Sequence, residues 1–172
     1  MKSIVIYSSL TGNTKQVAEA MTSVLPAGTP CVSMKEVPSD LSSYDLVFAG
    51  FWVDKGTANK EARDVLGTLH NPHIALFATA GVPPQMAHAK ESLINAANCL
   101  PDGVEPVGTF ICQGKVDPKV IEMMYKMFPK GHSHGQSADR DARHKQAAVH
   151  PNEDDFKAAQ DFAQHILVKL DR

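Results

Sequence analysis

The stretch SIVIYSSLTGNT, residues 3–14, decides the fold. Its first half is a short apolar run rich in β-branched residues, which is typical of a buried strand. Its second half is an uncharged polar loop with one glycine, and apolar positions recur at helical spacing over residues 14–25. A strand, a glycine turn and a helix start bring backbone N–H groups to one point, where the helix dipole favours an anion. The stretch therefore predicts a phosphate-binding loop, and the alternative is a simple capped helix start.

Similar apolar runs recur along the chain and alternate with helical patterns. The runs are residues 3–8, 29–34, 45–51, 73–79 and 106–112. One helix is expected to begin at Thr57 as its N-cap, and another to run from Pro84 to Ala97. Five strands separated by helices predict an α/β fold, a single doubly wound parallel sheet that is covered on both faces.

The alternation ends at Cys112. Asp117 as N-cap and Pro118 after it predict a helix that closes at Pro129, and Ser137 is a second candidate cap within the polar residues 131–150. A last amphipathic helix follows, with acids in its first turn. Its predicted inner face is Phe156, Ala159, Phe162, Ala163, Ile166, Leu167 and Leu170. We expect one domain over residues 1–172, with a helical and polar insertion at about 116–150.

Methionines give the helix after Asp117 a soft apolar face. The face comprises Met123, Met124, Tyr125, Met127 and Phe128. We interpret it as core packing, and the alternative is a lid or a surface on which a partner docks.

Composition excludes several classes of partner. The chain has 172 residues and a formal charge of −2, with scattered basic residues, so neither nucleic acid nor an anionic membrane surface is expected. The amino-terminal apolar segment is too short for a signal peptide, and no stretch approaches the roughly 20 apolar residues of a membrane span. We therefore expect a cytoplasmic protein. Its oligomeric state is left open.

Cysteines and histidines give no pattern for a metal. Cys31, Cys99 and Cys112 are widely spaced, which favours three buried, reduced thiols over a disulfide framework or a zinc site. His132 and His134 have an HxH spacing but lie in a polar segment without further convergent ligands, so we expect a solvated loop and no metal.

The loop of residues 8–14 is chemically neutral. Its hydroxyls on Ser9, Thr11 and Thr14 add donors, and Gly12 allows close approach or a positive φ. A site without cations suits a phosphate that stays bound and uncleaved, which indicates a cofactor. The patterns GxxxxGK[ST] and GxGxxG are absent from the sequence, so a nucleoside triphosphate or a dinucleotide is not expected.

Residues 9–14, SLTGNT, resemble the [ST]-x-T-G-x-T loop of the flavodoxin family. The resemblance implies strand order 2-1-3-4-5, with flavin mononucleotide (FMN) at the carboxyl ends of the strands. It also implies that the phosphate is held by Ser9, Leu10, Thr11, Gly12, Asn13 and Thr14.

Two further loops belong at the same sheet edge if the resemblance holds. In GFWVDKGTAN (50–59), the implied flavin contacts are Phe51, Trp52, Val53, Asp54, Lys55 and Gly56. Trp52 is expected to stack on the ring while its neighbour Phe51 packs in the core, since neighbours on a strand point opposite ways. The Gly56 carbonyl is the candidate partner of the flavin N5–H, a contact that favours the semiquinone in this family.

Two charges in that loop would have opposite effects on the flavin. An acid such as Asp54 near the ring lowers the reduction potential, whereas a lysine such as Lys55 near N1 or O2 raises it. The sequence leaves open which of them faces the ring, and the alternative is a solvated pair.

The second loop is ATAGVPP (78–84). Its small residues let the backbone meet the pyrimidine edge of the flavin, with Thr79, Ala80, Gly81 and Val82 as the implied contacts. The alternative is an ordinary turn between strand and helix. Residues 113–115, QGK, reach the same edge and rank lower.

The resemblance implies an FMN-binding electron-transfer protein that shuttles electrons between redox partner proteins. No catalytic side chain is assigned, because the flavin carries the chemistry. The alternative is an FMN-dependent NAD(P)H oxidoreductase of the same fold. The lack of a second nucleotide motif supports the carrier, whereas the balanced charge does not, since flavodoxins that dock basic partners are generally more acidic.

Overall fold

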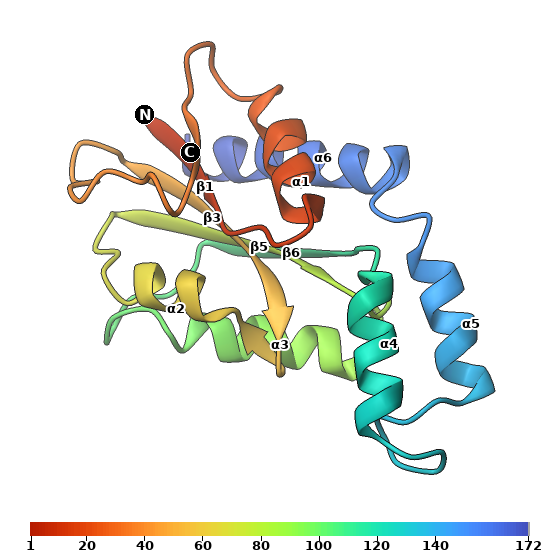
Figure 1. The fold of residues 1–172 in the computed structure, drawn as a ribbon. Coiled ribbons are helices and arrows are strands. Elements are labelled where there is room, and N and C mark those ends of the chain that lie inside the picture. The colour runs from red at the N-terminus through yellow and green to blue at the C-terminus, as the bar shows by residue number, and fades with distance from the viewer. Residues whose placement is uncertain (172) are drawn as a thin grey trace.

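Parallel strands form the centre of the structure, which is a computed structural model that describes residues 1–171 (Figure 1). The strands are β1 (Ser3–Tyr7), β2 (Cys31–Ser33), β3 (Leu46–Asp54), β5 (His73–Ala80) and β6 (Gly108–Gln113). They lie in the order β2-β1-β3-β5-β6, and all four neighbouring pairs are parallel. A two-residue strand, β4 (Thr57–Ala58), pairs antiparallel with the end of β3. The five parallel strands thus have the predicted order 2-1-3-4-5.

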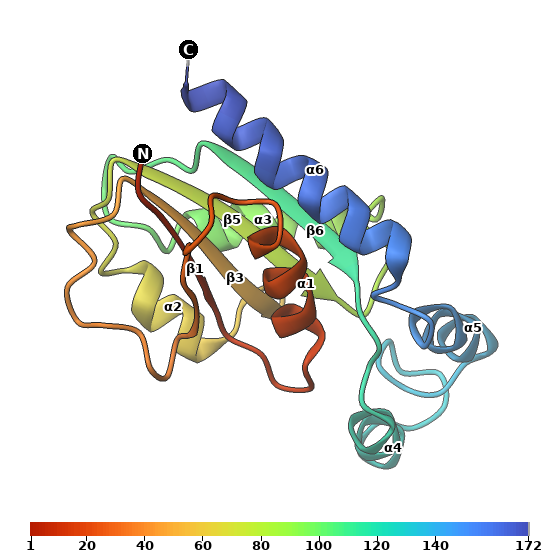
Figure 2. The same cartoon turned by 90° about the horizontal axis from the view of Figure 1, so that it is seen from above.

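Helices cover both faces of this sheet (Figure 2). Helices α1 (Asn13–Thr22) and α6 (Glu153–Leu170) pack on one face, and α2 (Lys60–Leu66) and α3 (Ala87–Ala97) pack on the other. Two more helices, α4 (Pro118–Met127) and α5 (Ala138–Ala147), lie beyond the carboxyl ends of β5 and β6 in both views. The chain therefore has the layers of a doubly wound α/β fold, as predicted.

Successive side chains of β3 point to opposite faces of the sheet and pack in two separate cores. Phe48 packs with the α1 and α6 side, whereas Ala49 and Phe51 pack with the α2 and α3 side. Because both faces are covered, β3 reads as an almost continuous apolar run. Gly50 has no room for a side chain, since a Cβ there would lie 2.1 Å from the Phe77 ring.

The start of α2 differs from the prediction. Thr57 is not its N-cap, because Thr57 and Ala58 form β4, and Asn59 is the cap residue before Lys60. The cause is a two-residue turn at Lys55 and Gly56, both with positive φ (50° and 77°), which folds the chain back on β3. Helix α3 likewise begins later than expected, at Ala87, after an extended Met86.

The caps predicted for α4 and α5 are confirmed. Asp117 accepts a hydrogen bond from the Lys119 N–H at 2.8 Å, and Ser137 accepts one from the Arg140 N–H at 3.2 Å. Asn152 and Asp155 form a capping box at the start of α6. On the inner face of α6, Ala159, Ala163 and Ile166 are fully buried, and the other predicted members pack partly buried beside them.

The prediction that α4 is a core helix is wrong. None of its residues is fully buried, and Met123 and Met127 are 53% and 64% exposed. Its less exposed side faces α5, where the Tyr125 hydroxyl donates to Asp141 at 2.9 Å. The reason is position, because the helix lies past the sheet edge instead of on a sheet face.

The three cysteines are free thiols. Cys112 is buried, and burial raises the pKa of its thiol to about 12, so it stays protonated. Cys31 and Cys99 are only half-buried, which corrects the expectation of burial for those two. Within residues 1–171, no three or more His, Cys, Asp or Glu side chains gather to hold a metal ion. None of the helices in that range has both the length and the apolar character of a membrane span.

Candidate functional site

The loop between β1 and α1 presents a cluster of unpaired donors. Gly12 takes the left-handed conformation, with φ at 95°, and its N–H donates to the Ser9 hydroxyl oxygen at 3.1 Å. The other backbone N–H groups of the loop find no acceptor within residues 1–171, and they belong to Ser9, Leu10, Thr11, Asn13 and Thr14. A left-handed residue among free N–H groups at a helix start forms a concave site for an anion.

Thr14 connects this loop to the end of β5. Its hydroxyl lies 2.9 Å from the hydroxyl of Thr79, and both side chains are buried. Thr14 therefore anchors the loop to the first residue of the predicted segment Thr79 to Val82, and only part of its hydrogen-bonding capacity is left for a ligand. Thr11 is exposed, so its hydroxyl is free to donate.

Trp52 lies beside Thr79 in the sheet. The two residues are direct partners in the pairing of β3 with β5. Trp52 is partly exposed, whereas Phe51 is 0% exposed and belongs to the core against α2 and α3. The opposite orientation predicted for these neighbours is confirmed, and Phe51 has no surface to offer a ligand. Contact of Trp52 with a cofactor stays a prediction.

The turn that follows Trp52 is anchored to α3. The Gly56 carbonyl accepts a hydrogen bond from the Asn95 side chain at 2.8 Å, so one lone pair of the predicted N5 acceptor already has a partner. Lys55 is exposed at the tip of the turn, and Asp54 pairs with Thr57 across it. Val53 packs partly buried against the core on the α2 and α3 side. The Gly56 contact also stays a prediction.

The loop after β6 is the most tightly connected of the loops at this edge. The Gly114 N–H donates to the Ala80 carbonyl at 2.8 Å, and the buried Gln113 side chain donates to the Gly81 carbonyl at 3.2 Å. The Asn13 side chain donates to the Lys115 carbonyl at 2.9 Å. A Cβ on Gly114 would lie 2.8 Å from Asn13, so glycine permits this approach. Residues 113–115, which ranked low from sequence, thus join two of the predicted binding loops.

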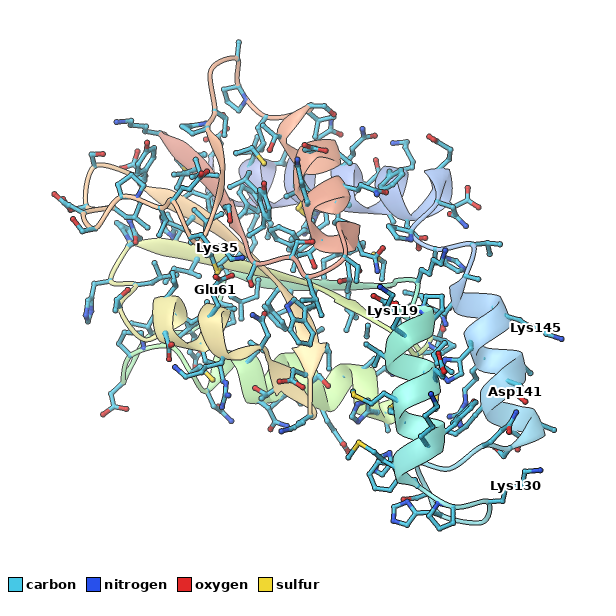
Figure 3. All side chains as sticks on the ribbon, in the orientation of Figure 1. Lys35, Glu61, Lys119, Lys130, Asp141 and Lys145 are labelled. Atoms are coloured by element: carbon cyan, nitrogen blue, oxygen red, sulfur yellow. The ribbon has the colours of Figure 1, made fainter. Side chains whose placement is uncertain are left out.

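A buried polar network behind the phosphate loop was missed by the sequence analysis. The Ser8 hydroxyl donates to the Glu61 carboxylate at 2.5 Å and accepts from the Asn59 side chain at 2.8 Å. The Asn59 Oδ1 atom is buried and has no hydrogen-bond partner within residues 1–171. Figure 3 shows Glu61 directed from the start of α2 toward the sheet. The available signal was a polar residue, Ser8, at the end of an apolar strand.

Comparison with known proteins identifies the family. Residues 4–164 match the flavodoxin domain. The chain belongs to the flavodoxin domain family. The flavodoxin-like domain-containing protein BilS of Clostridioides difficile is 34% identical over 176 residues, which cover 98% of each chain.

Solved flavodoxins share the fold. A flavodoxin of Streptococcus pneumoniae TIGR4 has a TM-score of 0.56 at 15% identity, with 97% of this chain and 98% of that chain covered. A flavoprotein of Lactobacillus acidophilus, solved in complex with FMN, has a TM-score of 0.51 at 18% identity, with 64% of this chain and 93% of that chain covered. Flavodoxin family members bind FMN, so the fit of this edge to FMN is the relevant test.

The donor set at the flavodoxin edge fits a phosphate. The free N–H groups around Gly12 can donate to phosphate oxygens. The partly exposed Trp52 lies on β3, the strand next to β1, and its partner on β5 is Thr79. Two depressions of the surface lie elsewhere. One, of about 570 Å³, lies between α3 and the start of β6, and the other, of about 520 Å³, lies at residues 37–42 and 65–72. The phosphate loop itself presents its donors on an open surface, since Thr11 is exposed and Leu10 is 65% exposed.

Proposed function

We propose that this flavodoxin-domain protein binds one FMN noncovalently and carries electrons between redox partner proteins. The observation that carries the proposal is the group of unpaired N–H donors around the left-handed Gly12. Most of this loop is at least partly exposed, and a phosphate at the helix start would accept hydrogen bonds from several of these N–H groups at once.

Three segments would hold the cofactor. The loop of Ser9 to Thr14 would take the phosphate, Trp52 would cover the ring, and Thr79 to Val82 would meet the polar edge of the ring through the backbone. FMN, when bound, supplies transfer of electrons singly or in pairs. The chain's own contribution is a preformed donor loop, which Thr14 fixes to Thr79 and Asn13 fixes to Lys115.

The cofactor is tested by reconstitution. The protein is incubated with FMN and with FAD in parallel, and the flavin that remains after desalting is released by heat and identified by chromatography. We expect FMN to be retained in preference to FAD, because one phosphate loop and no dinucleotide pattern are present. Retention of FAD, or of neither flavin, contradicts the proposal.

The carrier role is tested with the FMN-loaded protein. Stepwise photoreduction should show two resolved one-electron steps in the visible spectrum. Millimolar NADH or NADPH should bleach the flavin slowly or not at all. Rapid bleaching by either nucleotide in a single two-electron step would support the NAD(P)H oxidoreductase instead.

A further inference from the structure

The segment of residues 115–150, which contains α4 and α5, differs in charge from the rest of the chain. It has four acids, Asp117, Glu122, Asp139 and Asp141. Its basic residues number seven and are Lys115, Lys119, Lys126, Lys130, Arg140, Arg143 and Lys145. The remaining residues have ten basic and fifteen acidic side chains. A protein with a formal charge of −2 therefore has a basic segment of formal charge +3.

Most acids of this segment already have local partners. Asp117 caps α4, Glu122 pairs with Lys126 at 2.7 Å, and Asp141 accepts from Tyr125 and from Gln136. Within residues 1–171, Lys119, Lys130 and Lys145 form no ion pair. Figure 3 shows Lys130 and Lys145 pointing away from the α/β body and Lys119 at the end of α4 nearer the sheet. Their charges are thus available to a partner.

Exposed methionines lie on the same segment. Met123 and Met127 are four residues apart on α4, so they share one face of the helix, and both are more than half exposed. Methionine side chains adapt to differently shaped partners and are enriched at interfaces. The segment therefore has exposed apolar side chains on α4 as well as a positive formal charge.

Both ends of the segment lie at the edge of the sheet where the flavin is proposed to bind. Its two ends meet, because the Lys115 N–H donates to the His150 carbonyl at 2.8 Å. The Lys115 carbonyl in turn accepts from Asn13 of the phosphate loop. A partner seated on α4 and α5 would therefore lie next to the carboxyl ends of β5 and β6.

We infer that α4 and α5 form the docking surface for an acidic redox partner protein. The inference rests on the proposed function, and it defines the partner by charge. The unpaired lysines attract an acidic surface, and Met123 and Met127 add an apolar contact on α4. The charge preference is the reverse of that of an acidic flavodoxin that docks basic partners.

Binding is tested first without any need for flavin. Fluorescein-labelled poly-L-glutamate is titrated with the protein, and anisotropy is recorded from 20 to 300 mM NaCl. The charge reversal K119E/K130E/K145E should weaken binding about tenfold or more at low salt. The matched control K35E/R63E/K90E changes the net charge equally at three exposed basic residues of the α/β body that also form no ion pair within residues 1–171, and it should alter affinity by less than about twofold. Equal losses in the two variants, or no binding by the unaltered protein, overturn the inference.

Electron transfer is tested second, with photoreduced FMN-loaded protein. Acidic cytochrome b5 should be reduced faster than basic cytochrome c at low salt, and the preference should disappear in K119E/K130E/K145E. M123Q/M127Q should slow reduction of cytochrome b5 at every salt concentration, because it removes apolar contact and not charge. If a DNA duplex or phosphatidylglycerol vesicles bind these lysines while cytochrome b5 has no advantage, the surface serves another partner and the inference fails. Failure to retain FMN removes this second arm and the proposed function, whereas the poly-L-glutamate titration still decides the surface.

Discussion

The hydroxyl of Thr14 meets the hydroxyl of Thr79 at 2.9 Å, which joins the start of α1 to the end of β5 inside the protein. Replacing either threonine by valine leaves the other hydroxyl buried without this partner. We expect the single variants to lose about 1–2 kcal/mol of unfolding free energy and the double variant to lose less than the sum. Urea unfolding of all four proteins measures the coupling. Strict additivity would show that the two hydroxyls do not interact.

Thr11 should behave differently from Thr14. Its side chain is exposed and makes no hydrogen bond within residues 1–171, so Thr11→Ala should leave the unfolding free energy unchanged. If the hydroxyl donates to the phosphate, FMN affinity should fall by about 1–2 kcal/mol. Flavin fluorescence titration measures the affinity. Equal FMN affinity in Thr11→Ala and the parent would remove Thr11 from the phosphate site.

Trp52 offers an optical test of the ring position. It is the only tryptophan, so protein emission on selective excitation reports on this residue alone. Binding of FMN should quench that emission strongly, because the indole would lie against the flavin. Trp52→Phe should retain FMN binding with little residual emission, which provides the control. Equal emission with and without bound FMN would place the indole away from the ring.

The Ser8 network should contribute to stability. Ser8→Ala removes the partner of both the Asn59 amide and the Glu61 carboxylate, so we expect a loss of about 1–3 kcal/mol in unfolding free energy. Ser39→Ala is the matched control, since that serine is exposed and its hydroxyl makes no hydrogen bond within residues 1–171, and it should change stability by less than about 0.5 kcal/mol. Thermal and urea unfolding provide the comparison. Similar losses in both variants would indicate that the buried network is energetically neutral.

Acid should weaken the packing of α4 on α5. Burial, with a further effect from the nearby Arg140 and Arg143 charges and an opposing one from Asp141, lowers the pKa of His144. Neither ring nitrogen has a hydrogen-bond partner within residues 1–171, and the ring lies 6.1 Å from that of Tyr125. The unfolded segment therefore takes up a proton at a higher pH than the folded one. Stability falls as the pH drops through about 6.5 and levels off below the lowered folded pKa.

Hydrogen exchange detects this effect locally. Protection factors of the α5 amides, corrected for the intrinsic exchange rate, should be lower at pH 5.5 than at pH 7.5. The difference should be smaller in His144→Gln, which cannot be protonated in this range. An equal decrease in the variant would assign the pH dependence to another group.

Local patterns predicted much of the fold and part of the site. The run at residues 45–51 marked β3, and the alternation of a strand was enough to send Phe51 to the core and leave Trp52 partly exposed. Asp117 and Ser137 were recognisable as caps because each acts on a backbone N–H within three residues of itself. Such features depend only on neighbours along the chain.

Contacts between residues far apart in the sequence could not be predicted from local patterns. Asn95 meets the Gly56 carbonyl across 39 positions, and Glu61 meets Ser8 across 53. Helical and strand periodicity relate residues only a few positions apart, so they predict neither of these contacts. The α4 face was misread for a related reason. An apolar face on a helix predicts that the helix packs on the core. Only the position of α4 past the sheet edge shows that no face of the sheet covers these side chains.

The hydrogen bond between Lys115 and the His150 carbonyl means that the chain leaves the sheet and comes back at nearly the same point. Exchange of residues 116–149 for a short turn, or for a segment of another length, would leave the strands and the closing helix in place, since loop-closure entropy rises only slowly with length. The segment can therefore diverge faster than the rest of the molecule. The proposed docking surface and the proposed FMN site would then be separately evolvable parts of one chain.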